Sequence, residues 1–353
     1  MRPIAEGLRS LVKGRVLDSS EVEPERTTNF GHVFTARPGA VLEPAHAEDV
    51  AGAIRFARNE GIPVSVRGAA HSQSQIAISN GGLLIDMRSM GRIGPVARGA
   101  SSVEVEGGAV WRDVVRATLQ SGLAPPVLTN NLSVTVGGTL STAGVGVASH
   151  RYGTQGDQVE ELTVVLGTGE IRTCGPERDP DLFWAVIAGL GQVGVIASAR
   201  LKLRSVRPMT RTYYLLYDDV HRFMEDTKTA MDSERWDHLE SWASPSPQGT
   251  KPVSGRRQVF ARWFFPFHPT VEFDEGSPPD DRALLDGLHP YDHLYTDDLP
   301  TLDFFERLED KRTCVIIDPI CEPGIEPARK LLHLVPHSVC RRDGVGSGLQ
   351  RDT

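Results

Sequence analysis

The stretch Arg67–Ser72, which reads RGAAHS, decides the fold together with Thr135–Gly144, which reads TVGGTLSTAG. The first follows the apolar run Ile62–Val66, so its Gly and Ala residues lie on the turn that leaves a predicted strand. Small residues at such a turn let backbone N–H groups approach a pyrophosphate. The second stretch adds a glycine pair and short hydroxyl side chains, which bind phosphate or ribose oxygens. Together the two stretches predict the walls of a nucleotide site.

Either stretch alone is weak evidence for a nucleotide. A glycine pair beside Ser and Thr is more often an ordinary turn. The interpretation therefore depends on what else the chain contains.

Six motifs follow one another in a specific order. They are RGAAHS, GGLLIDM at 81–87, VEVEGGAVWRDVV at 103–115, TVGGTLSTAG, HRYGTQGDQVEELTVV at 150–165 and DLFWAVIAGLGQVGVIASARL at 181–201. In this order they resemble the cytokinin dehydrogenases, from about residue 47 to residue 208. That family belongs to the FAD-linked oxidases, whose flavin domain is similar to that of vanillyl-alcohol oxidase and para-cresol methylhydroxylase. The resemblance implies an α+β fold, with a two-part FAD-binding domain of the para-cresol methylhydroxylase type followed by a partial α+β substrate (cap) domain.

Composition argues against nucleic acid and membranes as partners. The chain has 353 residues, enough for about two domains, and 38 Lys plus Arg against 46 Asp plus Glu give a formal net charge of −8. A negative surface repels phosphate backbones. No apolar run reaches the roughly 18 residues of a membrane helix, and the N-terminus MRPIAEGLRS lacks a secretory apolar core. We therefore expect a cytoplasmic protein.

The four cysteines form no metal or disulfide pattern. Cys174 follows a predicted strand, and Cys314, Cys321 and Cys340 lie near the C-terminus without close CxxC spacing. We expect no metal site, no disulfide framework, and a buried structural thiol at Cys174.

Helix and strand patterns alternate along the chain. The predicted helices are 47–59, 110–120, 180–188 with Asp179 as its N-cap, and 218–231. The predicted strands are 64–67, 83–87, 103–106, 161–166, 170–174, 195–203, 213–217, 236–242 and 258–265. This pattern predicts an α+β fold with a large mixed sheet.

Three parts are expected along the chain: an FAD-binding domain at 1–208, a partial substrate-binding cap domain at 209–312, and an atypical, unassigned tail at 313–353. The stretch Leu302–Arg307 (LDFFER) weakly resembles a later piece of the family's substrate domain. Family members continue well beyond this point and return to the flavin domain. The resemblance therefore implies a C-terminally truncated chain.

The resemblance also implies FAD as the cofactor, bound covalently through His71. A neutral imidazole nitrogen can act as the nucleophile toward the C8 methyl group of the flavin, although a loop histidine bonded to backbone is the alternative. The family carries glycine where this chain has Ala70, so the added methyl group would crowd the cofactor. Further residues map onto cofactor-binding positions: Val66, Gly68, Ala69, Ala70, Ser72, Asn130, Thr135, Gly137, Gly138, Ser141, Val145 and Ile196. For Val145 and Ile196, core packing is an equal alternative.

Asn130 is the candidate catalytic residue and also the largest departure from the family. In cytokinin dehydrogenases an aspartate five residues before the threonine of TVGG takes the proton of the substrate amine, and that position is Asn130 here. An amide does not accept a proton at neutral pH, and losing a positioned general base lowers the rate about a hundredfold to ten-thousandfold. Its carbonyl oxygen still accepts a hydrogen bond from an amine. Substrate binding is therefore expected to survive better than turnover.

Three functions remain open from the sequence. The first is an FAD-dependent oxidoreductase that oxidises the C–N bond of a cytokinin-like secondary amine and passes electrons to oxygen or a quinone. The second keeps the flavin but oxidises an alcohol or a sugar. The third is a catalytically inactive, truncated flavoprotein.

Overall fold

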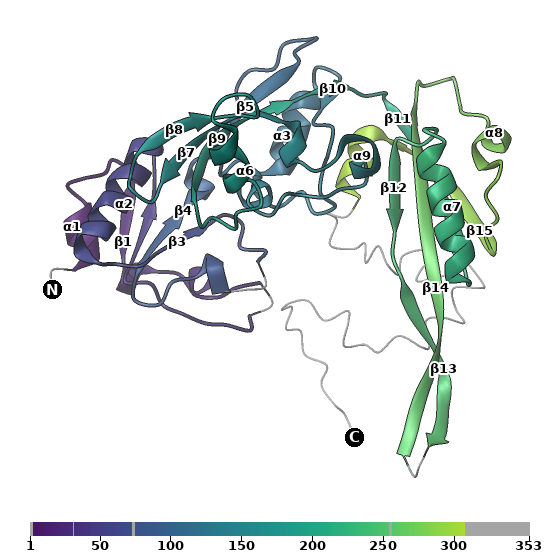
Figure 1. The fold of residues 1–353 in the computed structure, drawn as a ribbon, viewed down its shortest axis with the longest axis horizontal. Helices are drawn as coiled ribbons and strands as arrows, with labels where there is room; N and C mark the ends of the chain where they lie inside the picture. The colour runs from purple at the N-terminus through teal and green to yellow at the C-terminus, as the bar shows by residue number, and fades with distance from the viewer. Residues whose placement is uncertain (1–2, 31, 73–74, 254–255, 308–353) are drawn as a thin grey trace, which may run out of the picture.

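The computed structural model describes residues 3–30, 32–72, 75–253 and 256–307, and the side chains of 246–261 are not included in the description. The predicted tail at 313–353, with Cys314, Cys321 and Cys340, lies outside these ranges, as does the end of the predicted cap domain at 308–312. The described residues up to 208, named the flavin half after the domain expected there, form two four-stranded sheets and a two-stranded pair (Figure 1). The described residues from 209 on, named the cap after the expected cap domain, are built on one larger sheet.

The first sheet of the flavin half has the strand order β1-β2-β4-β3. Its strands are β1 (Arg15–Asp18), β2 (Ala40–Glu43), β3 (Val64–Arg67) and β4 (Leu83–Asp86). The strands β2, β4 and β3 run parallel, whereas β1 pairs antiparallel with β2. Because parallel strands need a crossover, helix α2 (Ala47–Glu60) connects β2 to β3 and packs its small apolar face on the sheet beside α1 (Ile4–Leu8). The carboxyl ends of three strands therefore share one edge.

The second sheet is antiparallel, in the order β5-β9-β7-β8. Its strands are β5 (Ser102–Glu106), β7 (Val159–Leu166), β8 (Ile171–Cys174) and β9 (Gly194–Lys202). Other elements of this half are α3 (Trp111–Leu119), α4 (Val136–Leu140), α5 (Ser149–Tyr152), α6 (Pro180–Val186) and the pair β6 (Leu123–Ala124) and β10 (Arg204–Ser205). Five short 3₁₀ turns complete the described part: η1 (Ser19–Glu21), η2 (Pro24–Thr27), η3 (Gln75–Ala77), η4 (Met87–Ser89) and η5 (Gly156–Gln158).

Two details differ from the sequence expectations. The prediction of one large mixed sheet is wrong, because Val165, Val195 and Ala197 of the second sheet pack into the core of the first one rather than extending its hydrogen bonding. Asp179 stands at the N-cap position of α6 but does not cap it. Its backbone is left-handed (φ 56°), and its carboxylate accepts a hydrogen bond from Arg172 at 2.5 Å. The predicted hairpin of β7 and β8 and the buried thiol of Cys174 are confirmed.

The cap is built on an antiparallel sheet with the order β12-β14-β11-β15. Its strands are β11 (Met209–Tyr217), β12 (His238–Ser241), β13 (Ser244–Val253), β14 (Arg256–Phe273) and β15 (Asp292–Pro300), and its helices are α7 (Val220–Asp232) and α8 (Asp281–Leu285). The strand β13 pairs with β14 alone, so the two project as a long hairpin away from the body (Figure 1). The core under α7 is aromatic, with Tyr213, Tyr217 and Trp236 fully buried.

The chain returns to the flavin half after β15. Helix α9 (Thr301–Glu306) lies within the residues that the sequence assigns to the cap, yet its Phe304 and Phe305 are buried in the core that includes Trp111 of α3. Glu306 also pairs with Arg116 at 2.5 Å. Helix α9 is thereby held against the flavin half.

A buried ionic cluster joins the halves a second time. Glu272 of β14 accepts hydrogen bonds from Arg204 of β10 at 2.6 and 3.1 Å and from His238 of β12 at 3.0 Å. Although burial by itself raises the pKa of Glu272, the hydrogen bonds from His238 and Arg204 lower it to about 2. Burial lowers the pKa of His238, so this ring is neutral and donates its Nε2–H to the carboxylate. The cluster fixes the cap on the flavin half.

Candidate functional site

The turn after β3 forms the first wall of the site. β3 ends at Arg67, whose buried guanidinium donates to the backbone oxygens of Glu25 (2.6 Å) and Thr28 (3.0 Å). Ala70 then adopts a left-handed conformation with φ 58°, which is the conformation that favours glycine. The resemblance implies a glycine at the position of Ala70, and the positive φ of this residue explains why glycine is favoured there.

The two opening motifs lie against each other. A Cβ placed on Gly68 would lie 2.1 Å from Oγ1 of Thr135, and one on Gly138 would lie 2.9 Å from the same atom. Thr135 itself is only 2% exposed. On the far side, a Cβ on Gly137 would lie 2.9 Å from the carbonyl oxygen of Gly107. The glycines therefore let three backbone segments approach closely, and the sequence prediction of paired walls agrees with this packing.

The rest of the second motif continues as helix α4 and a strained loop. Ser141 donates its hydroxyl hydrogen to the carbonyl oxygen of Gly137 at 2.7 Å, which leaves its lone pairs for another donor. Left-handed backbone recurs nearby at Ala143 (φ 71°), Ala188 (φ 58°) and Leu190 (φ 52°). Such non-glycine conformations cluster at ligand sites, because they cost energy and persist only where the fold enforces them.

The two apolar candidates differ in burial. Val145 is 67% exposed, so core packing does not describe it, and it stays a candidate for a cofactor contact. Ile196 is 4% exposed and packs in the core of the second sheet, so only its backbone remains available. Val66 is partly buried against the core of the first sheet.

His71 stands at the end of the first wall. Its ring stacks on Phe30, with centroids 5.1 Å apart and planes inclined by 27°. Its Nδ1 lies 3.2 Å from Nδ2 of Asn131. The backbone N–H of Phe30 donates to the carbonyl oxygen of Ser72 at 3.3 Å, so the segment that carries Phe30 is fastened directly beside the histidine.

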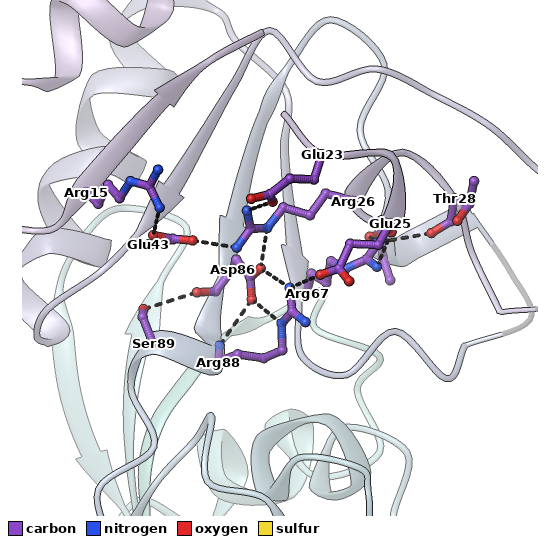
Figure 2. Close-up of polar contacts among 11 residues, drawn as sticks. Arg15, Glu23, Glu25, Arg26, Thr28, Glu43, Arg67, Asp86, Arg88 and Ser89 are labelled. Atoms are coloured by element: carbon purple, nitrogen blue, oxygen red, sulfur yellow. Dashed lines mark hydrogen bonds and ion pairs between the residues drawn. The ribbon is translucent and has the colours of Figure 1, made fainter. Parts of the chain in front are cut away.

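An ionic cluster holds that segment in place (Figure 2). At the shared edge of the parallel strands, Arg26 donates to Asp86 at 2.9 Å and to Glu43 at 2.5 Å, and Arg88 donates to Asp86 at 2.7 Å. The cluster lines an open pocket of about 730 Å³. Burial by itself raises the pKa of Asp86, but the hydrogen bonds from Arg88 and Arg26 lower it. Figure 2 shows that the cations and anions of the pocket satisfy one another, which makes the cluster a clamp for residues 23–28.

Asn130 connects the flavin half to the cap. Its Nδ2 donates to Oε1 of Glu240 in β12 at 2.5 Å, and Oε2 of Glu240 accepts from Arg307 at 2.8 Å. Glu240 lies 110 residues from Asn130 on a short cap strand, and no motif in the sequence points to it. Arg307 is the last residue of the stretch LDFFER. The structure thus brings a carboxylate to the position where the family's aspartate is replaced by an amide.

Aromatic side chains surround this contact on the cap side. His268 of β14 is the register partner of Glu240, and its ring lies 4.4 Å from that of Tyr214 and 4.7 Å from that of Trp242. Burial lowers the pKa of His268 to about 4, so the ring is neutral at pH 7. Trp242 is partly buried, and its Nε1–H has no hydrogen-bond partner within the described residues. This side of the site offers flat apolar surfaces and neutral hydrogen-bonding groups.

Comparison with known proteins finds an FAD-binding domain in the chain. Residues 38–175 match the family model described as an FAD binding domain. An uncharacterized oxidoreductase of the fasciation locus of Rhodococcoides fascians is 35% identical over 285 residues, which cover 80% of this chain and 62% of that protein. Over this domain the chain is similar to FAD-linked oxidases. Cytokinin dehydrogenase 7 of Oryza sativa subsp. japonica is 42% identical over 206 residues, covering 57% of this chain and 39% of that protein.

Solved structures support the fold. The crystal structure of 6-hydroxy-D-nicotine oxidase from Arthrobacter nicotinovorans superposes with a TM-score of 0.65 at 21% identity, covering 84% of this chain and 64% of that chain. The α+β FAD-binding oxidase fold predicted from the sequence is confirmed. The chain spans less than two thirds of the length of these relatives.

The described residues fit a bound FAD. The glycine contacts close the two walls, Val145 is left exposed beside them, and Oε1 of Gln155 is buried beneath Gly144 with no hydrogen-bond partner in the described ranges. None of the helices described here is long and apolar enough to cross a membrane. The same part of the chain contains no cluster of three His, Cys, Asp or Glu side chains arranged for a metal ion.

Proposed function

We propose that this protein is an FAD-dependent oxidoreductase that oxidises the C–N bond of a cytokinin-like secondary amine. The observation that carries the proposal is the contact between Asn130 and Glu240, which places an acceptor for the amine next to a carboxylate. Bound FAD supplies the acceptor for the hydride that leaves the substrate carbon. Oxygen or a quinone then removes the electrons. The relatives named cytokinin dehydrogenases support this substrate class.

The cofactor is proposed to lie between the two walls. Residues that would hold it are Val66, Gly68, Ala69, Ala70, Ser72, Asn130, Thr135, Gly137, Gly138, Ser141, Val145 and the backbone of Ile196, with a covalent bond through His71. Backbone N–H groups of the turn after β3 would meet the pyrophosphate. The left-handed backbone of Ala70 (φ 58°) lies in this turn, directly before His71.

Asn130 and Glu240 divide the work that one aspartate does in the family. Because Nδ2 of Asn130 donates to Glu240, Oδ1 of Asn130 is left to accept the amine N–H of the substrate. Oε2 of Glu240 is held by Arg307, so Oε1 is the oxygen that takes the amine proton. In this scheme Asn130 orients the amine, and Glu240 is the base.

The cap would bind the planar part of the substrate. The partly buried ring of Trp242 suits a flat heteroaromatic ring, and the neutral His268 beside it offers a hydrogen bond to a ring nitrogen. A secondary amine attached to such a ring would then reach Asn130, which lies beside Glu240.

The test is a substrate assay on the FAD-loaded protein with an artificial electron acceptor. We expect a cytokinin with a secondary amine to reduce the acceptor, and alcohols and sugars not to do so. Turnover of an alcohol or sugar in preference to the amine would instead establish the second function. Stable FAD binding with no turnover of any of them would establish an inactive flavoprotein. A cytoplasmic location stays part of this proposal.

A further inference from the structure

The side-chain amide of Asn131 has a fixed orientation. The backbone N–H of Ser133 donates to its Oδ1 at 2.8 Å, and a backbone N–H can only donate. The group that faces His71 is therefore the NH₂, whose Nδ2 lies 3.2 Å from Nδ1 of the imidazole. Because an amide NH₂ can only donate, Nδ1 of His71 accepts and carries no proton. The ring proton of the neutral form is on Nε2.

The ring is held in this orientation from a second side. Phe30 stacks on it at 5.1 Å, and the N–H of Phe30 donates to the carbonyl oxygen of Ser72. Stacking fixes the ring plane, but it does not distinguish the two ring nitrogens. The contact with Asn131 does distinguish them, because it engages Nδ1.

We infer that Asn131 is a positioning residue that selects Nδ1 of His71 as the nucleophile for flavin attachment. The inference rests on the covalent attachment proposed above. A nitrogen that carries a proton has no lone pair in the ring plane, so only the unprotonated nitrogen can attack carbon. Asn131 keeps that lone pair on Nδ1, at the cost of one exposed hydrogen bond of 3.2 Å, which is weak enough to break when the new bond forms.

Attachment removes two hydrogens and two electrons in total. A bond forms between Nδ1 of His71 and the methyl carbon on C8 of the flavin, and one C–H bond of that methyl group breaks. The ring loses its Nε2 proton as the double bonds shift, so the attached imidazole is neutral. The two hydrogens and their two electrons pass in total to dioxygen, which becomes hydrogen peroxide.

The decisive variant is Asn131→Asp. A carboxylate of the same shape keeps the bond from Ser133 but can only accept, so it draws the imidazole proton onto Nδ1. We expect Asn131→Ala to slow attachment about 3- to 10-fold, the equivalent of one hydrogen bond. Asn131→Asp should slow it by more than 10-fold, since charge-assisted hydrogen bonds are about twice as strong. Asn59→Asp, on the exposed end of α2, is the control for the substitution.

The measurement is the fraction of flavin that stays with the polypeptide after acid denaturation, followed over time after FAD is added to flavin-free protein. His71→Ala defines zero attachment. Asn131→Asp attaching as fast as the unaltered protein would overturn the inference. Faster attachment would also overturn it, because a carboxylate on Nδ1 makes Nε2 the better nucleophile.

A second readout needs no flavin. The ¹⁵N signals of His71 in flavin-free protein, assigned with His71→Gln, should show an unprotonated Nδ1 that becomes protonated in Asn131→Asp. An Nδ1 signal that is the same in both proteins would overturn the role of Asn131. If the unaltered protein never attaches flavin but its tautomer changes as expected, the covalent link has failed and the role of Asn131 in holding the tautomer stands.

Discussion

The two walls of the candidate site are built on different principles. The flavin-half wall, at 68–72 and 135–146, consists of small residues, left-handed turns and closely packed backbone. The cap wall consists of side chains: Glu240 and His268 lie on paired strands of one antiparallel sheet, and Trp242 follows directly after the first of these strands. A backbone wall suits a cofactor that every member of the family must bind in the same way. A side-chain wall can change one residue at a time, so the chemistry and the substrate are decided there.

The largest effect is expected from the cap wall. Glu240→Gln keeps the shape of the side chain and removes the proposed proton acceptor, so turnover of the amine should fall about 100- to 10,000-fold. The flavin content should stay the same, because the backbone wall is untouched. Steady-state kinetics with an artificial electron acceptor and an absorbance spectrum measure both quantities.

The matched control is Glu306→Gln, which removes a carboxylate paired with Arg116 at the residue directly before Arg307. Its turnover should equal that of the unaltered protein within a factor of about two, as expected for a surface ion pair. Equal losses of turnover in the two variants would mean that Glu240 acts through the stability of the fold. The assignment of the chemistry to the cap wall would then be wrong.

The next largest effect is expected at the buried cluster of Glu272, Arg204 and His238, which joins the two halves of the chain. Removing one partner from a buried ionic cluster costs about 3–5 kcal/mol of the free energy of unfolding, so Glu272→Ala should lower it by this amount. Chemical denaturation followed by tryptophan fluorescence measures the change. Asp274→Ala, which breaks the exposed pair with Arg207, should cost less than about 1 kcal/mol.

The same cluster makes the free energy of unfolding depend on pH. The pKa of Glu272 is about 2 in the folded state against an ordinary 4.5, so its contribution is complete above pH 4.5 and is lost as the pH falls toward 2. The pKa of His238 is lowered below its ordinary 6.5, so protons favour the unfolded chain from pH 6.5 downward. Stability should therefore decline steadily with acid below pH 6.5. Glu272→Gln should flatten the decline below pH 4.5, and an unchanged slope there would contradict the assignment.

The backbone wall was largely predictable and the cap wall was not, for a physical reason. Close backbone approach requires glycine or alanine at fixed spacing, so Gly68, Gly137 and Gly138 leave a local signature in the sequence. Glu240 and Trp242 have the sequence pattern of ordinary strand residues, because their roles come from contacts with residues far apart in the chain: Asn130 is 110 positions from Glu240, and His268 packs against Trp242 from another strand. The single mixed sheet was a wrong prediction for a similar reason. Periodicity predicts strands, but it does not predict which strands pair.

A smaller effect tests the backbone wall. Gly68→Ala places a Cβ 2.1 Å from Oγ1 of Thr135 in a buried position, so the walls must separate at a cost of about 1–3 kcal/mol. FAD affinity should fall by about 10- to 100-fold, measured by titration of flavin-free protein. The double variant Gly68→Ala with Thr135→Ala removes the clashing hydroxyl and should recover most of the affinity. Gly167→Ala, which meets nothing within 4 Å, is the control. A double variant no better than the single one would show that the walls do not meet at this contact.

The smallest effect concerns the same wall, and its sign separates backbone strain from crowding of the cofactor. Ala70→Gly removes the penalty of a left-handed alanine, about 1–2 kcal/mol, while it adds about 0.5–1 kcal/mol of backbone entropy to the unfolded chain. The flavin-free protein should therefore be stabilised by up to about 1 kcal/mol. Ala69→Gly, at a position without positive φ, carries only the entropy term and should destabilise it. If the methyl group of Ala70 also crowds the pyrophosphate, Ala70→Gly tightens FAD binding beyond this gain in stability. If both variants destabilise the protein alike, the fold does not enforce the left-handed turn, and this wall is more adaptable than its packing indicates.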